Sequence, residues 1–233
     1  AFEINAALVA ARGFAEIEGQ EATVLSTGTW YIAMRTPAAP VDLSALPEAR
    51  DCLVNVDAFG QPVPSARFMG GREIELLGAR IDLAEDQQAM LDTLPVILAK
   101  QVMILPTFAP GCGPFPDGSG EWIDKPVDMT EQRTAIALYA ALVTDAALDL
   151  IGAKDRLLIE GRFAGCNLFV RTLATLRPDT QVYAASEEAD VSLGALRLID
   201  PAIRPASALA VALPLDEDLN IYRAAWRLRR GKT

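Results

Sequence analysis

The stretch from residue 128 to residue 198 limits the fold more than any other part of the sequence, because helix-forming and strand-forming runs alternate there. Asp128 is suited to cap a helix, with Glu131 placed as in a capping box, and Gly152 is suited to end it. The runs that follow are a strand at Arg156–Ile159, a helix at Asn167–Leu176, a strand at Gln181–Ala184 and a helix at Glu187–Leu198. The links between these strands and helices are short, and this alternation predicts a parallel sheet with right-handed crossovers. Ligands of such sheets bind at the carboxyl ends of the strands.

The flanking regions add further elements. Helices are predicted at Ala6–Ala15 (interrupted by Gly13), at Asp82–Lys100 (broken at Pro95) and at Asp218–Arg230, and strands at Thr23–Leu25, Trp30–Met34, Val54–Val56 and Val102–Leu105. The stretch Pro106–Gly120 is rich in glycine and proline, which predicts a loop. Its length favours a functional loop over a passive connection.

The composition excludes several kinds of chemistry. The 233 residues include no histidine, which removes serine–histidine and cysteine–histidine nucleophile systems and every histidine-based metal site. A reaction must therefore use carboxylates, backbone amides, hydroxyl groups or a metal that arrives with the substrate. The formal net charge is −10, so the chain lacks the basic face that nucleic-acid binding requires. The basic residues near the C-terminus are typical of a solvated helix end.

The cysteines and the apolar runs bear on the cellular compartment. Cys52, Cys112 and Cys166 are far apart and form no CxxC pair, so a disulfide framework or a zinc knuckle is not predicted. No signal peptide is visible, and every apolar run is too short or too interrupted to span a bilayer. These features predict a cytoplasmic protein that does not contact a membrane.

Two glycine turns are candidate binding segments, and the first is Ser26-Thr27-Gly28-Thr29. A glycine beside small hydroxyl residues lets backbone N–H groups approach an anion, and a threonine hydroxyl adds a donor. Phosphate is the natural ligand of such a turn. On spacing alone, a plain β-hairpin turn is the commoner structure for this sequence.

The second turn runs from Ile159 to Asn167, between a predicted strand and a predicted helix. A strand end, glycines and a helix N-terminus together can bind a nucleotide, with Asn167 near the helix start. The segment does not match the GxGxxG fingerprint, and a structural strand-to-helix turn is the commoner outcome on sequence evidence alone.

Taken in order, these segments resemble the C-terminal domain of the FGGY carbohydrate kinases. Residues 24–30 resemble the hairpin that holds the terminal phosphates of ATP, and the form with Trp30 is similar to that of L-fuculose and L-rhamnulose kinases. Residues 107–115 occupy the place of the Gly/Pro-rich cleft loop, residues 160–167 that of the adenosine turn, and residues 187–195 that of the closing helix beside the nucleotide. The resemblance implies an actin-like ATPase (ribonuclease H-like) domain of the α/β class, with a mixed central sheet flanked by helices.

The sequence also departs from this family in three ways. The N-terminal actin-like half is absent, so residues 1–233 are expected to form a single C-terminal nucleotide-binding domain of a longer enzyme. Phe2-Glu3 stands where the family carries a His-Asp pair, so Glu3 is either a longer catalytic base or a terminal residue with no role. Arg162 replaces the second glycine of the adenosine turn, where it could stack on the base, contact a phosphate or point to solvent.

The resemblance implies a kinase that transfers the γ-phosphoryl group of ATP, with Mg²⁺, to the hydroxyl of a ketose or deoxyketose. Ser26, Thr27, Gly28 and Thr29 would hold the terminal phosphates, and Gly161, Arg162 and Asn167 would contact the adenosine. The expected partners are the sugar and the N-terminal domain, and a homodimer is left open. The isolated chain is expected to bind ATP weakly at most and to phosphorylate nothing.

Two other functions stay open at this stage: a non-catalytic actin-like nucleotide-binding module, and an interaction module that binds no nucleotide. The kinase hypothesis requires Gly28 and Gly161 to lie side by side in one crevice.

Overall fold

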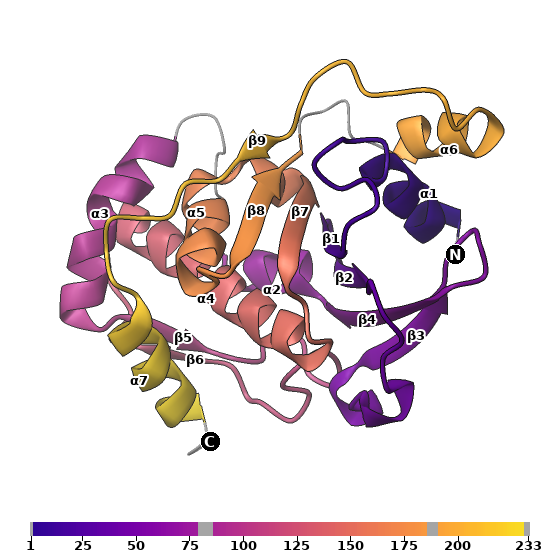
Figure 1. Cartoon of the computed structure of the whole chain (residues 1–233). Coiled ribbons are helices and arrows are strands. Elements are labelled where there is room, and N and C mark those ends of the chain that lie inside the picture. Colours follow the sequence, from indigo (N-terminus) through magenta and orange to yellow (C-terminus); the bar gives the residue numbers. More distant parts are fainter. Residues whose placement is uncertain (1, 79–85, 186–190, 231–233) are drawn as a thin grey trace.

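The computed structural model describes residues 2–78, 86–185 and 191–230, and within them the chain forms a layered α/β domain around a seven-stranded sheet. The strand order is β3-β4-β2-β1-β7-β8-β9, and a separate two-stranded sheet pairs β5 with β6 (Figure 1). The strands are β1 (Ala22–Thr27), β2 (Tyr31–Thr36), β3 (Cys52–Val56), β4 (Pro62–Phe68), β5 (Met103–Leu105), β6 (Glu121–Ile123), β7 (Asp155–Gly161), β8 (Thr180–Ala184) and β9 (Ala210–Val211). The prediction of a mixed central sheet is confirmed.

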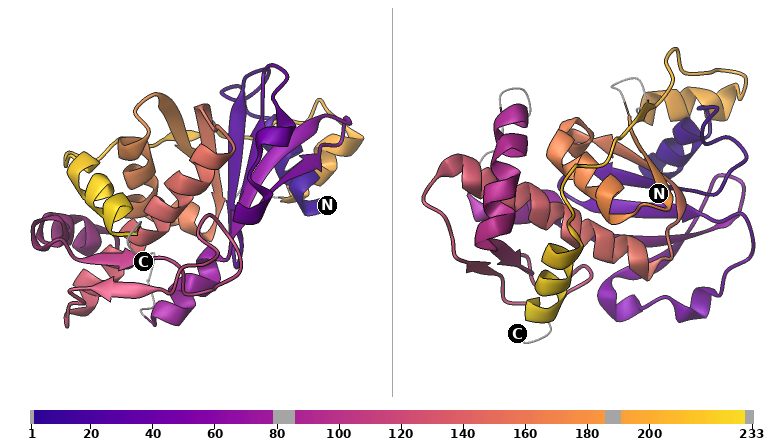
Figure 2. Two further views of the ribbon diagram at one scale, coloured as in Figure 1. Left: turned by 90° about the horizontal axis from the view of Figure 1, so that it is seen from below. Right: turned by 60° about the vertical axis from the view of Figure 1, so that its left-hand side comes forward.

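Helices cover both faces of the large sheet (Figures 1 and 2). They are α1 (Phe2–Ala11), α2 (Gly70–Leu77), α3 (Gln87–Lys100), α4 (Met129–Leu150), α5 (Asn167–Leu176), α6 (Val191–Ile199) and α7 (Asn220–Arg230), with the short 3₁₀ helices η1 (Leu43–Ala45), η2 (Glu48–Arg50) and η3 (Arg162–Gly165). Successive residues of β1 point to opposite faces: Leu25 packs in the core with α3, α4 and α5, whereas Val24 packs with α1. The central strands are therefore buried on both sides.

The register of the central strands determines where the turns lie. β1 and β2 form an antiparallel hairpin, while β7 runs parallel to β1 on one side and to β8 on the other. The parallel pairing predicted from the alternating helices and strands is thus confirmed. Because β1 and β7 point the same way, the turn after β1 and the exit from β7 lie at the same edge of the sheet.

Helix α4 begins and ends as its sequence predicts. The side chain of Asp128 accepts a hydrogen bond of 2.9 Å from the backbone N–H of Glu131. At the other end, Gly152 has a φ of 63°, and the N–H groups of Gly152 and Ala153 donate to the carbonyls of Asp149 and Leu148. This is a Schellman motif, in which glycine adopts the left-handed conformation at low cost.

The structure corrects the prediction that Pro95 breaks its helix. Helix α3 continues through Pro95, although proline removes one backbone hydrogen bond. Met90, Leu94 and Ile97 are fully buried on the face that packs in the core, and this tertiary packing outweighs the lost bond. The residues predicted to begin α3 and α6, at 82–85 and 187–190, lie outside the described ranges.

The sequence-based prediction did not include the strands β4, β6 and β9, the helix α2 or the short helices η1, η2 and η3. Pro62 and Pro64 argue against a central strand, yet β4 pairs with both β3 and β2. Its pairing with β2 covers Ser65–Phe68 only, so Pro64 faces β3 alone and behaves as an edge residue. Helix α2 opens with Gly70-Gly71, a pair that disfavours a helix on propensity.

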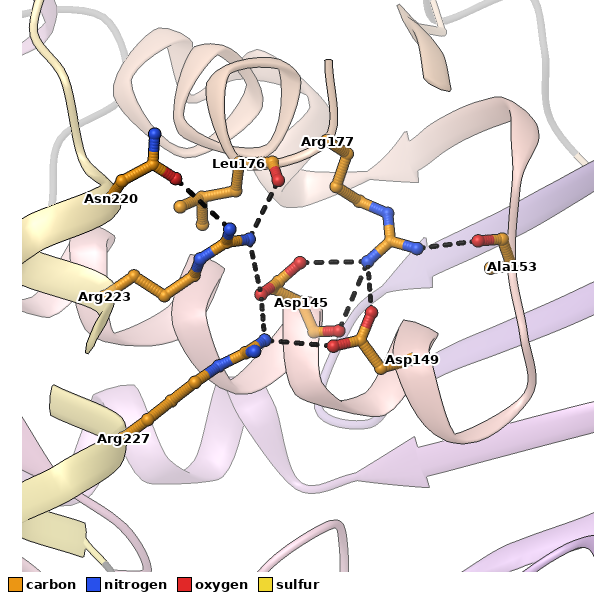
Figure 3. A network of polar contacts seen from close by, with 8 residues as sticks. All are labelled: Asp145, Asp149, Ala153, Leu176, Arg177, Asn220, Arg223 and Arg227. Atoms are coloured by element: carbon orange, nitrogen blue, oxygen red, sulfur yellow. Dashed lines mark hydrogen bonds and ion pairs between the residues drawn. The ribbon is translucent and has the colours of Figure 1, made fainter. Parts of the chain in front are cut away.

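The C-terminal helix α7 is held by a buried ionic network (Figure 3). Asp145 of α4 is 1% exposed and forms ion pairs with Arg177, at the end of α5, and with Arg223 and Arg227 of α7. Asp149, one turn later, pairs with Arg177 and Arg227 at the rim. The prediction of a closing helix at this place is confirmed.

Within the described ranges, no helix combines the length and the apolar character that a membrane crossing needs.

Candidate functional site

The first glycine turn joins β1 to β2. The backbone N–H of Gly28 donates to the carbonyl of Trp30 at 3.0 Å, which closes the turn. Gly28 and Thr29 are exposed, while Ser26 is half-buried at the end of the strand. The guanidinium of Arg67 lies 5.1 Å from the centre of the Trp30 ring and supports it from β4. The tip of this hairpin therefore presents backbone and a hydroxyl group to solvent.

The second turn follows β7 directly beside the first. Gly161 has φ 79° and ψ −163°, a combination open essentially to glycine alone. Gly161 is paired with Thr27 in the parallel register, and a Cβ at position 161 would lie 2.5 Å from the carbonyl oxygen of Thr27. The two predicted turns are thus in contact.

The hydroxyl of Thr27 bridges the two turns. It donates to the carbonyl of Glu160 at 2.5 Å and accepts from the backbone N–H of Phe163 at 2.9 Å. Thr27 is only 2% exposed, so its hydroxyl is engaged inside the protein and does not face solvent. The sequence suggested a threonine hydroxyl as a donor to an anion, and in this geometry Thr29 is the threonine exposed at the turn.

Replacing Thr27 with valine is expected to lower the free energy of unfolding by about 1–3 kcal/mol. The methyl group fills the same space, but the N–H of Phe163 and the carbonyl of Glu160 lose their shared partner in a buried position. Urea-induced unfolding measures the loss. Thr27→Ser, which keeps the hydroxyl, is the control, and a valine variant as stable as the serine variant would contradict the role given to this bridge.

The start of α5 is held by a side chain that the sequence-based analysis missed. Gln87 of α3 accepts a hydrogen bond of 2.8 Å from the backbone N–H of Asn167 and donates to the carbonyl of Gly165. One backbone N–H at this helix N-terminus thus already has a hydrogen-bond acceptor within the protein. The side chain of Asn167 is exposed, and Arg162 is exposed in η3, beside Gly161. No local pattern around position 87 could have indicated this long-range cap.

Helix α2 also approaches the first turn. A Cβ at Gly71 would collide with the carbonyl oxygen of Gly28, and a Cβ at Gly70 would lie 2.6 Å from the ring of Tyr31. Only glycines allow this helix start to reach the hairpin. Backbone N–H groups in the first turn of a helix have no partner within the helix and favour negative charge. The Gly70-Gly71 pair is the feature of the sequence that could have indicated this close approach.

The glycine- and proline-rich loop completes the cluster. A Cβ at Gly113 would lie 2.6 Å from the Cβ of Phe68 at the end of β4, and the N–H of Gly113 donates to Asp51 at 3.2 Å. The loop is therefore fixed next to the strand that leads into α2. The structure thus gathers the hairpin turn, the exit from β7, the start of α2 and this loop at one side of the sheet.

Two predicted site segments cannot be placed in this cluster. Glu3 lies in the first turn of α1, but its side chain is outside the described part of the structure. Residues 187–190 of the predicted closing helix are also outside the described ranges. In the described part of that helix, Gly194 of α6 packs closely against the backbone of Ala6 in α1.

Comparison with known proteins identifies related sequences and folds. A family model described as "Carbohydrate kinase FGGY, C-terminal domain" matches residues 19–207. The crystal structure of a carbohydrate kinase from Novosphingobium aromaticivorans is similar at 60% identity and a TM-score of 0.93, covering 97% of this chain and 50% of that one. A search of curated proteins finds no match.

More distant structures share the fold. Xylulose kinase from Bifidobacterium adolescentis is 18% identical with a TM-score of 0.66, covering 98% of this chain and 46% of that one. Plasmodium falciparum glycerol kinase with ADP is 12% identical with a TM-score of 0.66, covering 99% of this chain and 50% of that one. This chain therefore spans about half the length of the solved structures that it matches.

Proposed function

Because the chain belongs to the FGGY carbohydrate kinases, as their C-terminal domain, we propose that it is the nucleotide-binding part of an enzyme that transfers the γ-phosphoryl group of ATP to a sugar hydroxyl. The observation that carries the proposal is the contact between the turns at Gly28 and Gly161, at the carboxyl ends of two parallel strands. One extended ligand could contact both turns at this edge.

We propose different roles for the residues at the two ends of ATP. Ser26, Gly28 and Thr29 would face the terminal phosphates, because the exposed turn offers backbone N–H groups and hydroxyls to an anion. Thr27 would act indirectly, by joining the turns. Gly161, Arg162 and Asn167 would face the adenosine, since all three are exposed at the exit from β7 and the start of α5. Mg²⁺ would arrive with the phosphates and neutralise their charge.

The remaining parts of the reaction would come from outside the described cluster. In the proposed step, the sugar hydroxyl oxygen bonds to the γ-phosphorus, the bond to the β-phosphate oxygen breaks and ADP leaves. A carboxylate takes the hydroxyl proton, and Glu3 is our candidate for this base. An N-terminal domain outside residues 1–233 would supply most sugar contacts and close the cleft. We propose a ketose or deoxyketose as substrate and the cytoplasm as compartment, where the three free cysteines would stay reduced.

The proposal is tested by measuring ADP release by the full-length protein with Mg-ATP and a panel of ketoses and deoxyketoses. We expect turnover with at least one sugar, and no turnover by residues 1–233 alone. Undiminished turnover by Glu3→Gln in the full-length protein would exclude Glu3 as the base. Binding of Mg-ATP without transfer to any sugar would favour the non-catalytic nucleotide-binding module, and absence of Mg-ATP binding by the full-length protein would favour the interaction module.

A further inference from the structure

Glu73 is a buried carboxylate that the proposed reaction does not use. It lies on the inner face of α2 and is 3% exposed. The hydroxyl of Tyr139, on α4, donates to its Oε2, and the backbone N–H groups of Phe108 and Ala109 in the glycine- and proline-rich loop are also hydrogen-bonded to it. One carboxylate therefore connects three separate segments of the chain.

Burial of this group is costly, which makes its position informative. Burial raises the pKa of the Glu73 carboxyl above its ordinary value, and the hydrogen bonds from Tyr139, Phe108 and Ala109 oppose the rise. An apolar side chain of the same volume could fill this space without the cost of desolvating a charge. An apolar residue, however, could not accept hydrogen bonds from the two backbone N–H groups, so it could not fix the direction of the loop backbone.

The contacts of α2 link Glu73 to the candidate site. Gly71, two residues before Glu73 on the same helix, touches the carbonyl of Gly28 in the hairpin turn. On its other side, Glu73 holds the loop at Phe108, whose ring lies edge-on against Tyr139 with a centroid distance of 6.3 Å. The helix α2 is thus a short rigid connection between the hairpin turn and the loop.

We propose that Glu73 is a positioning residue, which sets the loop at residues 107–113 and the hairpin turn at residues 26–29 in a fixed relation for phosphoryl transfer. This inference rests on the proposed function. Phosphoryl transfer depends mainly on positioning and on neutralisation of charge, so a loop displaced by about 1 Å could slow the reaction about 100-fold. Glu73 itself is buried and would touch neither sugar nor nucleotide.

The test compares Glu73→Gln with Glu75→Gln in the full-length protein. Glu75 is exposed on the same helix and pairs with Arg72 at the surface, so it is a matched control for the loss of one charge. Glutamine at position 73 removes the negative charge and cannot accept from all three donors. We expect Glu73→Gln to lower kcat at least about 10-fold with KM for ATP within about twofold of wild type. We also expect faster hydrogen exchange confined to peptides covering 107–113, with Glu75→Gln unchanged in each measurement.

Tyr139→Phe gives a milder second variant in case Glu73→Gln does not fold. It removes one of the three donors, so we expect a smaller fall in kcat, about two- to fivefold, with faster exchange in the same peptides. Wild-type kcat in a folded Glu73→Gln or Tyr139→Phe variant, or unchanged exchange of the loop, would overturn the inference while leaving the proposed function intact. A wild-type protein that turns over no sugar would instead contradict the proposed function, and the inference with it.

Discussion

Replacing Asp145 with alanine is expected to lower the free energy of unfolding by about 3–5 kcal/mol, because it breaks a buried ionic network from its centre. The Asp145 carboxylate accepts bonds of 2.9 Å from both Arg177 and Arg227, and a nitrogen of Arg223 lies 3.5 Å away (Figure 3). Without it, three guanidinium groups are left close together, and among the described residues of this network Asp149 is the remaining carboxylate. The attachment of α7 to α4 and α5 should weaken accordingly.

Asp149→Ala is the matched control for this experiment. Asp149 contacts Arg177 and Arg227 at the same distance of 2.9 Å, but its side chain is 49% exposed, against 2% for Asp145. Exposed ion pairs contribute about 0–1 kcal/mol, so the control should lose no more than this. Urea-induced unfolding of both variants gives the comparison. Equal losses in the two would show that burial of Asp145 has no special effect on stability.

Replacing Gly161 with alanine is expected to weaken binding of Mg-ATP to the full-length protein at least about 10-fold. The new Cβ would lie 2.5 Å from the carbonyl oxygen of Thr27, so the turns at Gly28 and Gly161 must separate or tilt. The backbone conformation at Gly161 also costs about 1–3 kcal/mol for a residue with a side chain. Isothermal titration calorimetry measures the affinity, and circular dichroism verifies that the variant is folded.

Gly60→Ala separates the two causes. Gly60 also has a positive φ, 80°, but a Cβ there would meet nothing within 4 Å. This control keeps the strain of a positive φ and lacks the collision, and it lies in the turn between β3 and β4. We expect its affinity for Mg-ATP to equal that of wild type. An equal loss of affinity in both variants would mean that contact between the two turns is irrelevant to nucleotide binding.

Local patterns predicted the part of the fold whose causes are local. The capping residue Asp128, the stop at Gly152 and the alternating runs after Arg156 are consistent with one another, and helices and strands form there as predicted. The parallel sheet followed because short links leave few other connections. For the candidate site, glycine turns beside strands indicated which segments come together.

The features that the sequence did not predict depend on partners distant in the chain. Helix α3 tolerates Pro95 because of core packing, and Gln87 caps a helix that begins 80 residues later. The inward direction of the Thr27 hydroxyl is set by Glu160 and Phe163, more than 130 residues away. From its neighbours in the sequence, Glu73 is indistinguishable from an ordinary charged residue of a short helix. Side-chain direction and long-range hydrogen bonds come from the tertiary structure, which no window of residues contains.

The bridge from Thr27 to Glu160 spans 133 positions, and this separation has a consequence for how the domain is made. During synthesis from the N-terminus, the β1–β2 hairpin leaves the ribosome long before β7 exists. The edge of β1 that pairs with β7 therefore has no partner strand until β7 is made. Closing so large a loop is slow compared with forming local helices. The junction of the two turns therefore takes shape late, and a molecule that binds there would favour the last step of folding as well as the finished domain.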